Sequence, residues 1–135
     1  MESPADRYLR EHSSRQSQAL DWIEKQTNIH TNYPRMLSGA VQGRLLTMLV
    51  EISQAKHILE IGAFTGYSAT CMAYGLPADG HIDTLEINDE LEDLMREGWS
   101  RAEVSDKITL HIGDACETLS SLKGPYDLVY MDANK

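Results

Sequence analysis

Residues 56–102 read KHILEIGAFTGYSATCMAYGLPADGHIDTLEINDELEDLMREGWSRA. The run KHILEIG is short, apolar and ended by glycine, which is typical of a buried strand, and HIDTLEI is a second such run. Helical segments follow both runs, and Asn88 is a plausible N-cap of the second helix. Strands that alternate with helices at this spacing form parallel βαβ units with right-handed crossovers.

The pattern continues to the end of the chain. KITLHIG predicts a third strand, DACETLSSL a short helix and YDLVYMD a fourth strand after the turn KGP. The expected fold class is therefore α/β and Rossmann-like, with a mostly parallel sheet and helices on both faces.

The segment before residue 56 predicts helices only. Pro4 and Asp6 favour the start of a helix that runs to about Lys25, followed by a turn over residues 28–34. Ser38 precedes a second helix, in which apolar residues recur at helical spacing. We expect one domain over residues 1–135, divided into an N-terminal helical part (1–55) and a cofactor-binding βαβ core (56–135).

Composition excludes several classes of function. Of the 135 residues, 21 are acidic and 12 basic, which gives a net charge of −9 and disfavours binding to nucleic acid or to anionic membranes. The N-terminus is polar, unlike a signal peptide, and no stretch is long and apolar enough to span a bilayer. Two widely separated cysteines, Cys71 and Cys116, are expected to be reduced thiols. We therefore expect the protein to be cytoplasmic.

The stretch LEIGAFTGYS, residues 59–68, is the first candidate for chemistry. A glycine directly after a strand lets the backbone turn sharply and approach a ligand. Gly62 and Gly66 do not form the GxGxxG pattern of NAD sites, but the wider ExGxxxG form associated with S-adenosylmethionine. Glu60 is placed to interact with the positively charged ammonium group of that molecule, directly or through water. The alternative is an ordinary tight turn with Glu60 as a local cap.

Glu86 is the second candidate, 26 positions after Glu60 by subtraction. An acid at the end of the second strand is placed to accept hydrogen bonds from both hydroxyls of a ribose. A solvated carboxylate in a turn is the alternative at this position.

Two further groups follow the third and fourth strands. Asp114, with the backbone amides of Ala115 and Cys116, is placed to meet an adenine edge, and Asp114 is equally suited to cap the next helix. Asp132 is a hard oxygen ligand suited to Mg²⁺ or Ca²⁺, and Lys135 is a candidate base. Taken alone, both of these charges at the chain end would be solvated.

Together these motifs resemble the cation-dependent O-methyltransferases, the family of caffeoyl-CoA and catechol O-methyltransferases and their small bacterial relatives. The resemblance runs from about Arg35 to Lys135 and rests on RMLSGAVQGRLLTML, LEIGAFTGYSA, LPADGHI, DKITLHIGDA and YDLVYMDANK. It implies S-adenosylmethionine and a divalent cation as cofactors, and a small phenolic, catechol-like acceptor.

The resemblance also implies roles for individual residues. Positions around the methionine part of the cofactor are Glu60, Gly62, Ala63, Phe64 and Ser68, with Leu37 and Ser38 in a loop that closes over it. Glu86 corresponds to the ribose-binding acid, and Ala115 to an adenine contact. Asp132 corresponds to the first metal ligand, beside the cofactor, and Lys135 to the catalytic base.

Two departures from the family pattern limit what the resemblance implies. Asn134 stands where the family usually has an acid, which leaves the choice of substrate open. The sequence ends at Lys135, before the family's Asp-Asn pair that completes the metal site, so we expect the encoded protein to continue. A homodimer is expected. The rival hypotheses are an NAD-dependent oxidoreductase and a non-catalytic nucleoside-binding or dimerisation module.

Overall fold

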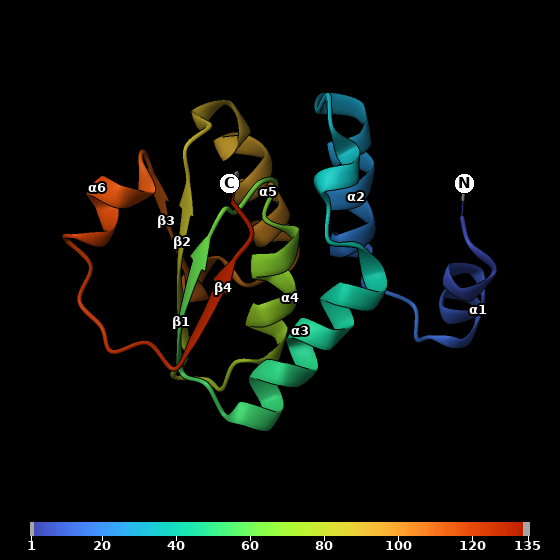
Figure 1. Cartoon of the computed structure of the whole chain (residues 1–135), viewed down its shortest axis with the longest axis horizontal. Helices are drawn as coiled ribbons and strands as arrows, with labels where there is room; N and C mark the ends of the chain where they lie inside the picture. The colour runs from blue at the N-terminus through green and yellow to red at the C-terminus, as the bar shows by residue number, and fades with distance from the viewer. Residues whose placement is uncertain (1, 134–135) are drawn as a thin grey trace.

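A single sheet of four parallel strands forms the centre of the computed structural model, which describes residues 2–133 (Figure 1). The strands are β1 (His57–Ile61), β2 (His81–Glu86), β3 (Ile108–Ile112) and β4 (Leu128–Met131). Their order in the sheet is β3-β2-β1-β4, so the chain moves outward from β1 to β3 and then returns to the other side of β1. Strand order therefore reverses at β1 and β4, and a ligand crevice is expected at their carboxyl ends.

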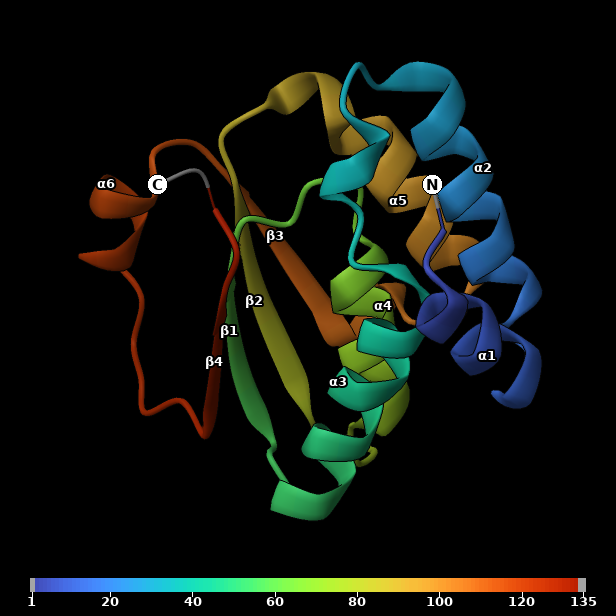
Figure 2. The same ribbon diagram turned by 45° about the vertical axis from the view of Figure 1, so that its right-hand side comes forward.

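Helices cover the two faces of the sheet unequally. Figures 1 and 2 show α2 to α5 on one side of the sheet and α6 alone on the other. The helices are α1 (Pro4–His12), α2 (Gln18–His30), α3 (Gly39–Ser53), α4 (Tyr67–Gly75), α5 (Glu92–Arg101) and α6 (Ala115–Leu119), and the 3₁₀ turns are η1 (Pro34–Met36), η2 (Asp89–Leu91) and η3 (Ser105–Lys107). The α/β, Rossmann-like prediction is confirmed.

The core follows from the alternation of side chains along the strands. Ile58 and Ile82 point to the α2–α5 face, where they pack in the main core with Met72 and Trp99. Leu59, Ile61 and Leu85 point to the opposite face and form a smaller cluster beneath the α6 segment. The helix-covered face therefore holds most of the buried apolar residues.

A polar network lies on the α6 face of the sheet. The carboxylate of Asp83 lies 3.1 Å from His57 Nε2 and 2.9 Å from His111 Nε2, and it accepts a hydrogen bond of 3.0 Å from the Tyr126 hydroxyl. The ring of Tyr126 also lies against His57, with 4.2 Å between ring centroids. The Asp83 carboxylate thus links β1, β2, β3 and the segment before β4.

The N-terminal helix differs from its prediction. In place of one helix from Pro4 to about Lys25, α1 ends at His12 and α2 begins at Gln18 and continues to His30. Ser17 accounts for the second start, because its side chain accepts a 3.3 Å hydrogen bond from Leu20 N and so caps α2. The predicted turn over residues 28–34 is correspondingly shorter.

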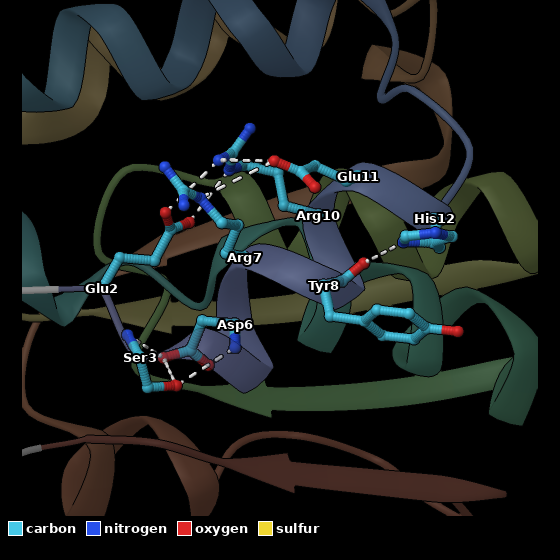
Figure 3. Close-up of polar contacts among 8 residues, drawn as sticks. All are labelled: Glu2, Ser3, Asp6, Arg7, Tyr8, Arg10, Glu11 and His12. Atoms are coloured by element: carbon cyan, nitrogen blue, oxygen red, sulfur yellow. Dashed lines mark hydrogen bonds and ion pairs between the residues drawn. The ribbon is translucent and has the colours of Figure 1, made fainter.

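Local polar contacts stabilise α1, which has no buried residue. Ser3 and Asp6 form a capping box, and Arg10 Nε pairs with Glu2 at 2.9 Å (Figure 3). In Figure 1 this helix stands at the edge of the molecule beyond α3. It is an appendage of the fold, and it contributes nothing to the core.

Three smaller findings complete the comparison with the sequence. Asn88 caps the 3₁₀ turn η2, by accepting from Glu90 N at 3.1 Å, so α5 begins later than predicted. Both cysteines are free thiols, Cys71 buried and Cys116 exposed. Within residues 2–133, no helix combines the length and the apolar character that crossing a bilayer requires.

Candidate cofactor site

The loop between β1 and α4, residues 62–66, has an unusual backbone and is called the glycine loop below. Gly62, Phe64 and Gly66 all adopt positive φ, at 97°, 53° and 85°. A Cβ on Gly62 would lie 2.8 Å from Ala133 N and 2.9 Å from Ala133 Cα. Glycine is therefore required at position 62 both by the backbone angle and because the Asp132–Ala133 backbone, just after β4, passes close to it.

Three anchors from three other elements hold this loop. Phe64 N donates a 2.7 Å hydrogen bond to Glu86 Oε1 at the end of β2. The buried hydroxyls of Thr65 and Thr27, the latter from α2, lie 2.9 Å apart. Trp99 Nε1 of α5 donates to Gly66 O at 3.2 Å. These three contacts hold the loop in its conformation.

Glu60 lies behind the loop and is completely buried. Its carboxylate accepts hydrogen bonds from two hydroxyls, those of Ser68 and, at 2.6 Å, Thr84. Burial raises the pKa of Glu60 to about 7, while the two hydroxyl donors oppose that rise. Glu60 is not among the residues that line the two hollows described below, whereas its partner Ser68 lines the smaller one.

Two adjoining hollows open at the carboxyl ends of the strands. The smaller, of about 270 Å³, lies beside α4, and the larger, of about 1020 Å³, extends past β2 to α2 and α5. Both are lined by Gly62, Phe64 and Asp132, so they meet at the glycine loop. An elongated ligand would fit across that meeting point, as the strand reversal predicts.

Predicted residues for the methionine part line the smaller hollow. These are Leu37, Ser38, Gly62, Ala63, Phe64 and Ser68. Leu37 and Ser38 come from the segment between η1 and α3, and they reach the glycine loop from the other wall of the hollow. The structure therefore brings together residues that are about 25 positions apart in the sequence.

Glu86 lies at the wall of the larger hollow, at the end of β2. One carboxylate oxygen accepts from Phe64 N, and the other accepts from Asn88 N at 3.0 Å. Each oxygen of a carboxylate has a second lone pair, so Glu86 can hold the loop and still accept from a diol.

The segment after β3 lines the far end of the larger hollow through Asp114, Ala115 and Cys116. Asp114 caps α6, because its Oδ1 accepts from Cys116 N at 2.8 Å and from Glu117 N at 3.3 Å. Of the two roles left open for Asp114, the capping role is confirmed. It also engages the Cys116 amide, which was predicted to face an adenine edge.

Asp132 is exposed after β4 and lines both hollows. Its amide donates to Ile61 O at 2.9 Å, which extends the β1–β4 pairing to the edge of the site. Within residues 2–133, no group of three or more His, Cys, Asp or Glu is arranged to hold a metal ion. The predicted metal ligand Asp132 is therefore not part of such a group, and Asn134 and Lys135 lie outside the described residues.

Sequence reasoning missed one wall of the larger hollow. It is formed by α2 and the segment that follows it, with Trp22, Gln26, His30 and Tyr33, and by the α5 residues Leu94 and Glu97. The guanidinium of Arg101 lies 4.5 Å from the centre of the Trp22 ring. No spacing signal points to this wall, because α2 and α5 meet only through tertiary packing.

Comparisons with known proteins agree with this geometry. The sequence profile of the O-methyltransferase family matches residues 10–135. The chain is 38% identical over 103 residues to a catechol O-methyltransferase of Mycobacterium tuberculosis, a match that covers 76% of this chain and 47% of that protein. It is 38% identical over 105 residues to caffeoyl-CoA O-methyltransferase 1 of Eucalyptus globulus, which covers 74% of this chain and 43% of that protein.

A solved structure extends the agreement to the backbone. The O-methyltransferase TomG from Streptomyces achromogenes, which is involved in tomaymycin synthesis and was crystallised in complex with SAM, superposes with a TM-score of 0.92 at 32% identity. The match covers 99% of this chain and 61% of that one, and the chain spans less than half the length of the two curated relatives above. The chain belongs to the O-methyltransferase family.

Proposed function

We propose that the whole protein to which this chain belongs is an S-adenosylmethionine-dependent O-methyltransferase. One observation carries the proposal: the glycine loop, Glu86 and the segment from Asp114 to Cys116 surround one continuous pair of hollows at the carboxyl ends of the strands. The complex of TomG with SAM supports the same ligand for a fold that matches along nearly the whole chain.

In this proposal, the ligand lies across the meeting point of the two hollows. Its amino-acid half would occupy the smaller hollow near Ser38 and Ser68, and its ribose would reach Glu86. When bound, the cofactor supplies a methyl group on a sulfonium centre, which is intrinsically reactive. The residues of this chain then have three tasks, to bind the cofactor, to align its methyl group and to exclude water.

The acceptor in our proposal is a small phenol with neighbouring hydroxyls. The names of the relatives, catechol and caffeoyl-CoA O-methyltransferase, support this class. A divalent cation is part of the same proposal, with Asp132 as one ligand at the mouth of the site and Lys135 as the base. Within residues 2–133, Asp132 is the ligand that this proposal assigns.

Calorimetric titration tests the cofactor proposal directly. We expect the chain to bind S-adenosylmethionine and S-adenosylhomocysteine, and NAD to bind at least about a hundredfold more weakly, since the loop lacks the GxGxxG form. Tighter binding of NAD would reject the proposal in favour of an oxidoreductase. Methyl transfer to a catechol, measured with the whole protein in the presence and absence of Mg²⁺, tests the acceptor and the cation.

We further propose a cytoplasmic homodimer. The two free thiols support a reducing compartment. The exposed apolar side chains of Tyr8 and Leu9 on α1, which has no buried residue, support contact with a second copy. Light scattering of the whole protein and of a variant that lacks residues 1–12 tests the dimer, which should dissociate in the shortened variant.

A further inference from the structure

Thr84 has no evident contact with the hollows, yet its hydroxyl is committed to the site. It lies inside β2, on the face covered by helices, and is completely buried. Its Oγ1 donates a 2.6 Å hydrogen bond to Glu60 Oε1. A threonine in a strand is commonly a packing residue, and its hydroxyl usually bonds to backbone. Here the hydroxyl instead donates to the buried carboxylate of Glu60 on the neighbouring strand β1.

The other partner of Glu60 explains this contact. Ser68 donates its hydroxyl proton to Glu60 Oε2, and it also lines the smaller hollow. A hydroxyl has one proton and two lone pairs. Once the proton of Ser68 points at Glu60, only lone pairs remain to face the hollow, so Ser68 can only accept a hydrogen bond from a ligand there.

We propose that Thr84 is a positioning residue which, through Glu60, fixes the Ser68 hydroxyl as an acceptor for the ammonium group of the cofactor's amino-acid half. The inference rests on the proposed function, and it names a residue that touches neither ligand nor solvent. Thr84 holds one oxygen of Glu60, which leaves the other oxygen, as an ionised acceptor, for the Ser68 proton.

This arrangement requires Glu60 to be ionised, and burial opposes ionisation, so a second hydrogen-bond donor to the carboxylate is needed. All contributions together raise the pKa of Glu60 to about 7; burial is the largest of them, and the negative charges of Asp132 and Glu86 act in the same direction. The hydroxyls of Ser68 and Thr84 oppose this rise, so they extend the pH range in which the carboxylate is ionised down to about 7. The neighbouring Cys71 thiol stays neutral, since burial raises its pKa to about 12.

Loss of the Thr84 hydroxyl should therefore reverse the polarity of the site. An oxygen of Glu60 would be left buried without a donor, and protonation would relieve it. A protonated Glu60 donates to Ser68, so the Ser68 proton would turn toward the hollow and oppose an ammonium group. Recognition of the cationic half would fail, while recognition of the nucleoside half would remain.

Two variants and two ligands test this inference. Thr84→Val removes the hydroxyl at nearly constant shape, and Thr84→Ser keeps it. We expect Thr84→Val to weaken S-adenosylhomocysteine about tenfold or more, and Thr84→Ser to bind like the wild type. Binding of 5′-methylthioadenosine, which has the nucleoside but no ammonium group, should stay within about twofold in both variants.

The pH dependence provides a second readout. In the wild type, affinity for S-adenosylhomocysteine should fall as the pH drops through about 7, where Glu60 gains its proton. In Thr84→Val the midpoint should move to higher pH, because a hydrogen bond that favours the ionised form is gone. A merely structural role for Thr84 would leave this midpoint in place.

Other outcomes are equally decisive. If Thr84→Val binds S-adenosylhomocysteine like the wild type, or loses both ligands to the same extent, the inference is overturned. A wild type that binds 5′-methylthioadenosine but not S-adenosylhomocysteine overturns the ammonium site and leaves the nucleoside site standing. A wild type that binds neither overturns the proposed function itself. Should Thr84→Val fail to fold, Ser68→Ala removes the acceptor directly and must show the same selective loss.

Discussion

The Glu86 carboxylate has partners in two directions at the end of β2. It accepts from Phe64 N and from Asn88 N, so it joins the glycine loop to the start of η2. A residue with this geometry affects a ligand twice, by direct contact with a diol and by the shape of the loop on which the ligand rests.

We predict that Glu86→Ala weakens S-adenosylmethionine binding at least about tenfold, because hydrogen bonds to a charged group contribute roughly 1.5–3 kcal/mol. Glu86→Gln keeps an acceptor for Phe64 N and should fall between the wild type and Glu86→Ala. Calorimetry on folded variants measures both. Equal and unchanged dissociation constants would remove Glu86 from the site.

Gly62 and Gly39 allow backbone strain to be separated from collision. Both have positive φ, 97° and 84°, but a Cβ on Gly62 would meet the Asp132–Ala133 backbone, whereas a Cβ on Gly39 meets nothing within 4 Å. We predict that Gly62→Ala lowers the free energy of unfolding by about 2–4 kcal/mol, and Gly39→Ala by only about 1 kcal/mol. Urea denaturation should give this order. Equal losses would mean that strain alone decides at position 62.

At the scale of elements, α2 is part of the site although it precedes the sheet by many residues. The Thr27 hydroxyl lies 2.6 Å from Ile23 O and 2.9 Å from Thr65 Oγ1, and both threonines are fully buried. This contact couples the position of a helix to the conformation of the glycine loop.

We therefore predict that Thr27→Val destabilises the protein by about 1–3 kcal/mol, since the buried Thr65 hydroxyl loses its partner. Hydrogen exchange at the amides of the loop should become faster than in the wild type. The control Thr27→Ser keeps the hydroxyl and should leave the exchange rates nearly unchanged. If exchange in the loop is as slow in Thr27→Val as in Thr27→Ser, the two elements are not coupled through this hydroxyl.

The elements also differ in how far the sequence could predict them. All four strands could be predicted, and the bounds of three of them agree within about one residue at each end. Apolar runs that end at turn residues are strong local signals. The gap between α1 and α2 was missed, since its polar residues are compatible with a helix and only the Ser17 cap decides the break.

The site divides in the same way. Glu86 and the residues of the glycine loop could be predicted because they end strands, and the ends of parallel strands meet at one edge of the sheet. Thr27, Thr84 and Trp99 could not, because their roles depend on which hydroxyl or indole a folded neighbour brings into reach. Motif spacing contains no record of those contacts.

At the scale of the whole molecule, the Asp83 network joins β1, β2, β3 and the segment before β4 on the α6 face. Burial alone would raise the pKa of Asp83, but hydrogen bonds from His111, His57 and Tyr126 outweigh it, so the pKa lies below its ordinary value. A carboxyl whose pKa is lower in the folded state contributes stability above its unfolded pKa, and that contribution is lost as the pH falls through the folded value.

We predict that Asp83→Asn is less stable than the wild type at pH 7, and that the difference shrinks as the pH falls below about 4, the ordinary pKa of an aspartate, and through the lower pKa of the folded state. Urea midpoints at pH 7 and pH 3.5 provide the comparison, with the exposed Asp106→Asn as control. A difference that is constant across this range would show that the network contributes shape, with no contribution from charge.

The two tryptophans of the chain differ in their exposure to solvent. Trp22 lines the larger hollow beneath Arg101, while Trp99 is buried behind Gly66 and bonded to its carbonyl. The intrinsic fluorescence of the protein should therefore have a red-shifted, quencher-accessible component and a blue-shifted, protected one. A ligand that fills the larger hollow should shield only the first from iodide, and Trp22→Phe should abolish that response. The fold thus contains its own optical probe of occupancy, which requires no label and no turnover.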